Sequence, residues 1–121
     1  MKTKLCSKCK MDKKFTDFYY NTRGKPISTC RLCENKKDVR RRIKLKEFIY
    51  SLKKPCVVCG ESNPTVIDFH HIDSSEKIFT IGKSNIRSHD RIRNEVAKCA
   101  CLCANHHRMV HAGEIDLNKY V

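Results

Sequence analysis

Four cysteines in two short pairs constrain the beginning of the chain more than any other feature. Cys6 and Cys9 form one Cys-x2-Cys pair, and Cys30 and Cys33 form another after an interval of twenty residues. This spacing is typical of a structural zinc site with four thiolate ligands. Aromatic residues make up only 7% of the 121 residues, and Trp is absent, so an apolar core alone would be small. We therefore predict a zinc finger over residues 1–35 that folds around its metal.

A second structural zinc site is expected later in the chain, with a less regular set of ligands. Cys56 and Cys59 form a third pair, and Cys103 and His106 are the most direct partners for it. Together they would give three Cys ligands and one His ligand. Cys101 is a competing ligand, and thiols left without zinc are expected to behave as small buried hydrophobic residues. Because no apolar N-terminal stretch resembles a secretion signal, we expect all nine cysteines in a reducing cytoplasm.

The excess of positive charge lies wholly in the first half of the chain. The net charge is +13; residues 1–54 contain 18 Lys and Arg against 5 Asp and Glu, whereas residues 55–121 contain 8 of each. A half this basic favours a polyanionic partner, which is either nucleic acid or an anionic membrane surface. The membrane is the weaker choice, because the arginine-rich stretch has no apolar face before Leu45. We expect a soluble protein that does not bind membranes.

Residues 36–54 are predicted to form a basic helix that connects the two zinc-bearing parts. Apolar residues recur at three- and four-residue spacing from Leu45 to Leu52, and no Gly or Pro interrupts residues 34–52. Basic side chains bind phosphates and give affinity without sequence specificity, and charge alone does not distinguish DNA from RNA. The expected nucleic-acid contacts are Lys36, Lys37, Arg40, Arg41, Arg42, Lys44 and Lys46.

Four of the six histidines form two pairs, and these pairs indicate the chemistry. His107 and His111 are four residues apart, which places both rings on one face of a helix where they can chelate one divalent ion. His70 and His71 follow residues 65–69, an apolar and β-branched run that is predicted to be a strand. Adjacent residues of a strand point to opposite sides. One of these two histidines is therefore expected to bind metal and the other to do proton chemistry.

Three further elements are predicted around the histidine pairs. Residues 77–81 are expected to form a short strand. Ser88 is expected to cap a helix that continues through Ile92 and Val96, and residues 104–112 are expected to form a last helix closed by Gly113.

Three segments of the second half resemble the HNH endonucleases of phages and bacteria. They read Val66-Ile-Asp-Phe-His-His-Ile-Asp73, Lys77-Ile-Phe79 and Glu95-Val-Ala-Lys-Cys-Ala-Cys-Leu-Cys-Ala-Asn-His-His-Arg-Met-Val-His-Ala-Gly113, and the resemblance covers residues 56–113. It implies a ββα-metal domain over residues 55–121, in which a short hairpin carries one histidine pair and a helix carries the other. The N-terminal finger also resembles four-cysteine fingers found ahead of such domains. The implied fold is a small, zinc-stapled α+β protein.

The resemblance also implies a role for each histidine of the two pairs. His71 resembles the general base, whereas His70, His107 and His111 resemble the ligands of a catalytic Mg²⁺, Mn²⁺ or Zn²⁺ ion. An imidazole can accept a proton near neutral pH, and a cation stabilises the charge that develops during phosphodiester hydrolysis. The implied function is a metal-dependent endonuclease or nickase that acts on double-stranded DNA in a bacterial or phage-infected cell. A homodimer is left open.

Two positions depart from the pattern of the family. His106 stands where the family usually has Cys, although histidine also ligates zinc. Lys98 stands where the family usually has the Asn that orients the loop bearing the base, and Asn94 and Asn105 lie at other spacings. The alternative function is therefore a non-catalytic zinc-finger protein that binds nucleic acid and retains a vestigial HNH site.

Overall fold

The computed structural model describes residues 2–82 and 88–121. In this part the protein has three α-helices and three two-stranded sheets, which confirms the small α+β class. The chain divides into a first unit that ends at Lys44 and a second unit, Leu45–Val121. The division falls inside one helix, α1 (Arg31–Ser51). No helix in the described ranges is long and apolar enough to cross a membrane.

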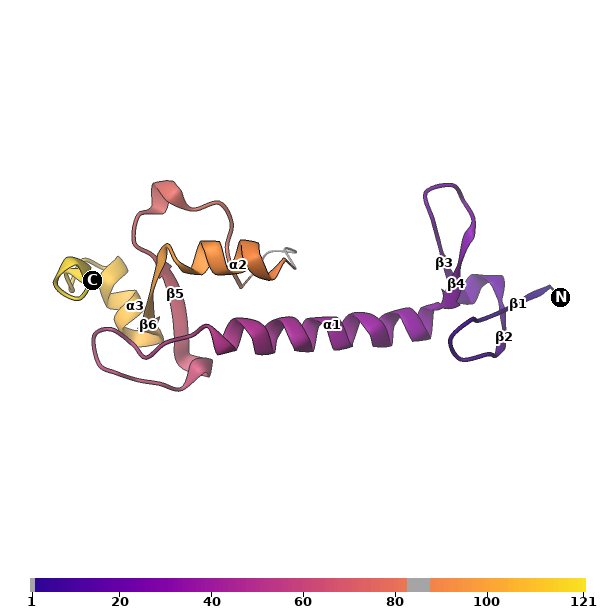
Figure 1. Ribbon diagram of the computed structural model, residues 1–121, viewed down its shortest axis with the longest axis horizontal. Coiled ribbons are helices and arrows are strands. Elements are labelled where there is room, and N and C mark those ends of the chain that lie inside the picture. The colour runs from indigo at the N-terminus through magenta and orange to yellow at the C-terminus, as the bar shows by residue number, and fades with distance from the viewer. Residues whose placement is uncertain (1, 83–87) are drawn as a thin grey trace. The chain divides into compact units, whose positions relative to one another are not determined.

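Two small hairpins precede α1 in the first unit (Figure 1). Strand β1 (Thr3–Leu5) pairs antiparallel with β2 (Asp12–Lys14), and β3 (Phe18–Tyr20) pairs with β4 (Pro26–Cys30). The buried core of this unit consists of Phe18, Cys6 and Cys30. So few apolar contacts cannot hold strands of three to five residues by themselves, which agrees with a finger that needs a metal.

Helix α1 begins at Arg31, directly after β4, and ends at Ser51 before Pro55. It therefore begins before the predicted connector and includes Cys33 in its first turn. None of its residues is fully buried, and the basic side chains from Lys36 to Lys46 are all exposed. Solvated cations along a helix are free to contact an external polyanion.

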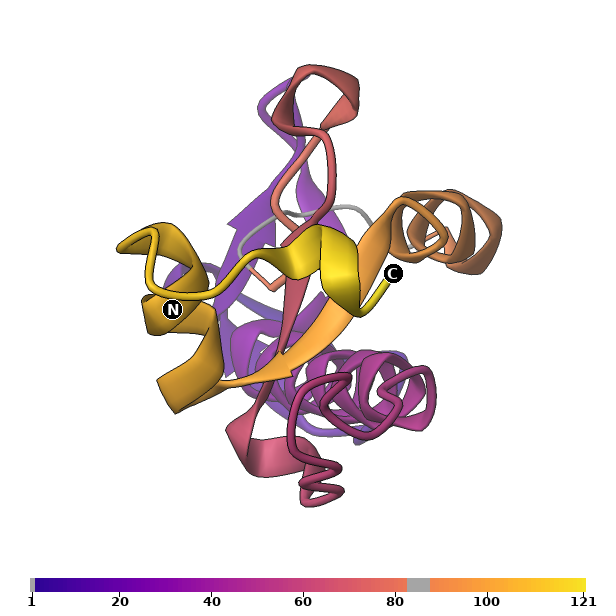
Figure 2. The ribbon, with the colours of Figure 1, turned by 90° about the vertical axis from the view of Figure 1, so that its left-hand side faces the viewer.

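The second unit is built on one hairpin with a helix on each side. Strand β5 (Ile67–His71) pairs antiparallel with β6 (Cys99–Cys103), so that Ile67 lies opposite Cys103 and His71 opposite Cys99. Helices α2 (His89–Val96) and α3 (Ala104–His111) lie on opposite sides of this hairpin (Figures 1 and 2). The buried core contains Cys56, Ile67, Cys101, Leu102 and Cys103, with Val58, Phe69, Val110 and Leu117 packed against it.

The helix boundaries of the second unit follow the predicted caps, but one predicted strand is absent. Ser88 caps α2, because its Oγ accepts a hydrogen bond from the backbone N–H of Arg91 at 3.4 Å. Gly113 follows α3 with a φ of 79°, a conformation that favours glycine. The strand predicted at residues 77–81 was wrong. The backbone N–H groups of Ile78 and Phe79 donate to the side chain of Glu95 and not to a neighbouring strand.

Candidate metal centres and active site

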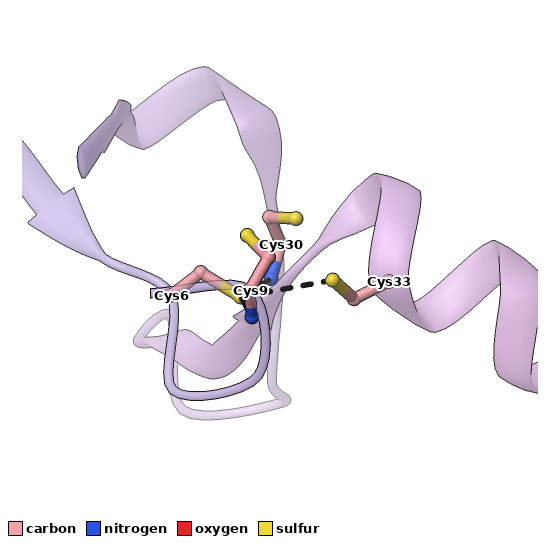
Figure 3. Close-up of side chains that lie close together, drawn as sticks. All are labelled: Cys6, Cys9, Cys30 and Cys33. Atoms are coloured by element: carbon pink, nitrogen blue, oxygen red, sulfur yellow. Dashed lines mark hydrogen bonds between the residues drawn. The ribbon is translucent and has the colours of Figure 1, made fainter. Parts of the chain in front are cut away.

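The two cysteine pairs of the first unit converge on one point. Cys6 and Cys9 lie in the turn after β1, Cys30 ends β4, and Cys33 lies in the first turn of α1 (Figure 3). The four sulfur atoms lie within 4.8 Å of one another, and those of Cys6 and Cys33 are 3.9 Å apart. Tetrahedral zinc with Zn–S bonds of about 2.3 Å places its sulfur ligands about 3.8 Å apart. The cluster therefore fits a structural zinc ion.

The knuckles that present Cys6 and Cys56 have the same backbone geometry. The N–H of Lys10 donates to the carbonyl of Cys6 at 2.9 Å, and the N–H of Gly60 donates to that of Cys56 at 2.8 Å. Lys10 and Gly60 both have positive φ, at 60° and 79°. The same turn thus follows each Cys-x2-Cys pair, although only one of the two has the glycine that this conformation favours.

The second cluster brings together the four residues expected from the sequence. Cys56, Cys59, Cys103 and His106 offer ligand atoms within 4.8 Å of one another. The sulfurs of Cys59 and Cys103 are 3.8 Å apart, which again matches tetrahedral zinc. The competing Cys101 is not in this cluster; its sulfur accepts the backbone N–H of Lys54 at 3.4 Å.

The surroundings of the sulfur atoms favour the thiolate form that zinc requires. Burial raises the pKa of Cys6 and of Cys56, but backbone N–H donors outweigh it and lower each pKa to about 6. Burial and hydrogen bonds to the neighbouring thiols raise the pKa of Cys33. Sulfur atoms so close together do not all ionise without a cation among them. A structural Zn²⁺ would supply that cation.

We predict that each purified chain retains about two zinc ions. Both clusters offer four ligands and leave no open position, so a weak chelator is expected to leave their zinc in place. Elemental analysis after dialysis against such a chelator measures the ratio. A ratio near zero, with the thiols oxidised in pairs, would contradict both sites.

Three histidines form a third cluster of a different kind, beside the hairpin of the second unit. Ligand atoms of His70 on β5 and of His107 and His111 on α3 lie within 4.8 Å of one another. The Nε2 atoms of His107 and His111 are 3.1 Å apart, so their lone pairs are available to one shared ion. Burial, followed by repulsion from the neighbouring imidazoles, lowers the pKa of His70. His70 is thus held neutral, which is the form that binds metal.

The third cluster is open, and one of its ligands is oriented by a carboxylate. His111 is exposed and three protein ligands leave further positions for water or phosphate, as in catalytic metal sites. Nδ1 of His107 lies 3.1 Å from Oδ2 of Asp68. Asp68 precedes His70 by two residues on β5, so the two side chains are on the same face of the strand. A carboxylate on one ring nitrogen fixes the other toward the metal. Asp68 was not predicted from the sequence as a residue of this site.

His71 points away from this cluster, to the side of the hairpin that α2 covers. Its Nε2 lies 2.8 Å from Oε2 of Glu95, whose side chain is 1% exposed. The opposite placement of His70 and His71 follows from the alternation of an extended strand. Glu95 was also missed by the sequence analysis. Its spacing of three residues from the buried Ile92 is the signal that could have placed it on the inner face of α2.

A cleft of about 670 Å³ in the second unit lies beside both the third cluster and His71. Both His71 and His107 line it, so a molecule in the cleft can contact both. Three cationic side chains also line it: Lys46, Lys53 and Lys77. Such a cleft attracts anions to the histidines.

Comparison of the chain with protein-family models, with curated proteins and with solved structures gives no match.

Proposed function

We propose that this protein is a metal-dependent nuclease that hydrolyses phosphodiester bonds of DNA, with the ββα-metal site of the HNH endonucleases that its sequence resembles. One observation carries the proposal. One lysine-lined cleft is lined both by His107, a member of an open cluster of three imidazoles, and by His71, a fourth imidazole that contacts a buried carboxylate. Phosphodiester hydrolysis needs a cation-binding site, a base and a way to hold phosphate, and this arrangement offers all three.

The histidines and lysines of this site have separate roles in the proposed reaction. His71 takes a proton from the water that attacks phosphorus. A new P–O bond forms as the bond to the 3′ oxygen breaks, and the 3′ oxygen takes up a proton from solvent water, which leaves a 5′ phosphate and a 3′ hydroxyl. His70, His107 and His111 would hold a divalent ion, which would stabilise the charge on the phosphate and on the departing oxygen. The cleft lysines hold the phosphate backbone near the site.

Supercoiled plasmid tests this function directly. Purified protein is incubated with plasmid in Mg²⁺, in Mn²⁺ and in EDTA, and the fractions of nicked and linear DNA are followed with time. Nicking that requires the divalent ion is expected. If the protein binds the plasmid but never cuts it with any divalent ion, the non-catalytic zinc-finger function is correct.

The exposed basic residues of α1 are proposed to bind the DNA backbone. Replacing the three arginines at 40–42 by Gln is expected to weaken binding and to reduce the slope of log affinity against log salt by about two to three, because each lost phosphate contact changes it by about 0.9. Binding titrations on one duplex at several salt concentrations measure the slope. A control with the same charge loss replaces three exposed lysines of the first unit that lie outside the zinc knuckle, Lys2, Lys14 and Lys25. Equal slopes for the arginine variant and the wild type would contradict the role of α1.

A further inference from the structure

Glu95 is the one charged side chain that is fully buried within residues 2–82 and 88–121. A buried charge is costly unless hydrogen bonds and opposite charge surround it. The reaction steps described above assign this carboxylate no role beyond its contact with His71. Its surroundings show what it does for the neighbouring His71.

Every partner of the Glu95 carboxylate is positioned as a hydrogen-bond donor. Oε2 accepts from the backbone N–H groups of Ile78 and Phe79, at 2.9 Å and 3.4 Å. The same oxygen lies 2.8 Å from Nε2 of His71, and Oε1 accepts from the ammonium group of Lys98 at 2.8 Å. Both oxygens are therefore in contact with groups that favour the ionised carboxylate.

These contacts favour the ionised form of Glu95. Burial raises the pKa of Glu95, but the hydrogen bonds from Lys98, Ile78, His71 and Phe79 together outweigh it and lower the pKa to about 2. An ionised carboxylate has no proton to donate and can only accept hydrogen bonds.

The contact between His71 and Glu95 therefore defines which ring nitrogen carries the proton. Nε2 must be the donor, and when the ring is neutral the lone pair is on Nδ1. We propose that Glu95 is a positioning residue that fixes this tautomer of His71, so that Nδ1 is the atom that takes the proton from the attacking water. The inference rests on the nuclease function proposed above.

Lys98 extends the same arrangement to the chain segment after β5. Its Nζ donates to the backbone carbonyl of Glu76 at 3.0 Å as well as to Glu95. Residues 76–79 are thus attached at one end to Lys98 and at the other to Glu95. Since this segment follows the strand that bears His71, the Glu95–Lys98 pair holds the imidazole and the adjoining loop together.

The tautomer can be measured without any cutting assay. Long-range ¹H–¹⁵N correlation spectra of the full-length zinc-loaded protein distinguish the two ring nitrogens of a neutral histidine, and the signal missing from His71→Ala assigns His71. A proton on Nε2 of His71 in the wild type is expected. A proton on Nδ1 would overturn the inference, whether or not the protein is a nuclease.

Two variants test the role in the reaction. Glu95→Gln places an amide among four donors, and it is expected to allow both tautomers of His71 and to slow nicking about tenfold to a hundredfold with zinc content unchanged. Lys98→Met removes the link to Glu76 and is expected to slow nicking as well, whereas Lys119→Met, at an exposed lysine outside the arrangement, is the matched control. Wild-type nicking rates in both test variants would overturn the inference. If Glu95→Gln does not fold, the wild-type spectrum and the nicking rate of Lys98→Met test the inference.

Discussion

A His71→Ala variant is expected to lose about two to four orders of magnitude in nicking rate while its fold and its affinity for DNA stay nearly unchanged. Removing a general base typically costs this much in rate and little in binding. The side chain is only 10% exposed, yet its one strong partner is Glu95, which keeps Lys98 and two backbone N–H groups when the imidazole is gone. Single-turnover rates and binding titrations on the same duplex separate the two effects.

The chain offers a matched control for this variant. His89 lies in the same unit, stacks on Phe48 with ring centroids 3.7 Å apart, and is not part of the histidine cluster. His89→Ala is expected to cut at nearly the wild-type rate. If His71→Ala cuts as fast as His89→Ala, His71 is not the base.

A Cys56→Ser variant is expected to unfold the second unit, which is the other large effect. Structural zinc contributes about 10–16 kcal/mol in zinc-finger peptides, whereas a whole domain is stable by only about 5–15 kcal/mol. The loss of one ligand from a four-ligand site therefore exceeds what a core of five buried residues can compensate. The measurement is zinc content together with thermal unfolding followed by circular dichroism; zinc content near one per chain and loss of the cooperative transition of this unit are expected.

Cys99→Ser is the control for the zinc prediction. Cys99 lies outside both clusters, and burial together with the charge of Glu95 raises its pKa to about 11, so it remains a thiol. This variant is expected to keep two zinc ions and nearly the wild-type melting temperature. A Cys56→Ser protein that also keeps two zinc ions would show that the second cluster is not a zinc site.

The clusters of metal ligands could be predicted because their geometry is local in sequence. Two cysteines three positions apart fit one turn, and two histidines four positions apart share one helix face. The choice between Cys101 and Cys103 was less local. It depends on the register of β6, in which Cys101 lies opposite Phe69 whereas Cys103 ends the strand directly before α3.

The arrangement around Glu95 could not be predicted from the same patterns. Apolar periodicity describes where side chains point, but it does not say which acceptor a backbone N–H finds. Residues 77–81 therefore resembled a strand, although the N–H groups of Ile78 and Phe79 bind the carboxylate of Glu95 on α2. Lys98, at the position where the resembling family has Asn, was a reason to doubt catalysis. The structure instead gives it hydrogen bonds to Glu95 and to the loop after His71.

The dependence of cutting on divalent metal, compared between wild type and His107→Ala, tests the proposed nuclease site most directly. Both proteins are first freed of loosely held metal by dialysis with a weak chelator that leaves the two structural zinc ions, and nicking is then measured over a range of Mn²⁺ concentrations. The wild type is expected to be inactive without added metal and to reach a plateau of rate. His107→Ala, with zinc content unchanged, is expected to need at least about tenfold more metal, because one of three ligands and its link to Asp68 are lost. Superimposable metal dependences in the two proteins, or no cutting by the wild type at any metal concentration, would contradict the proposal.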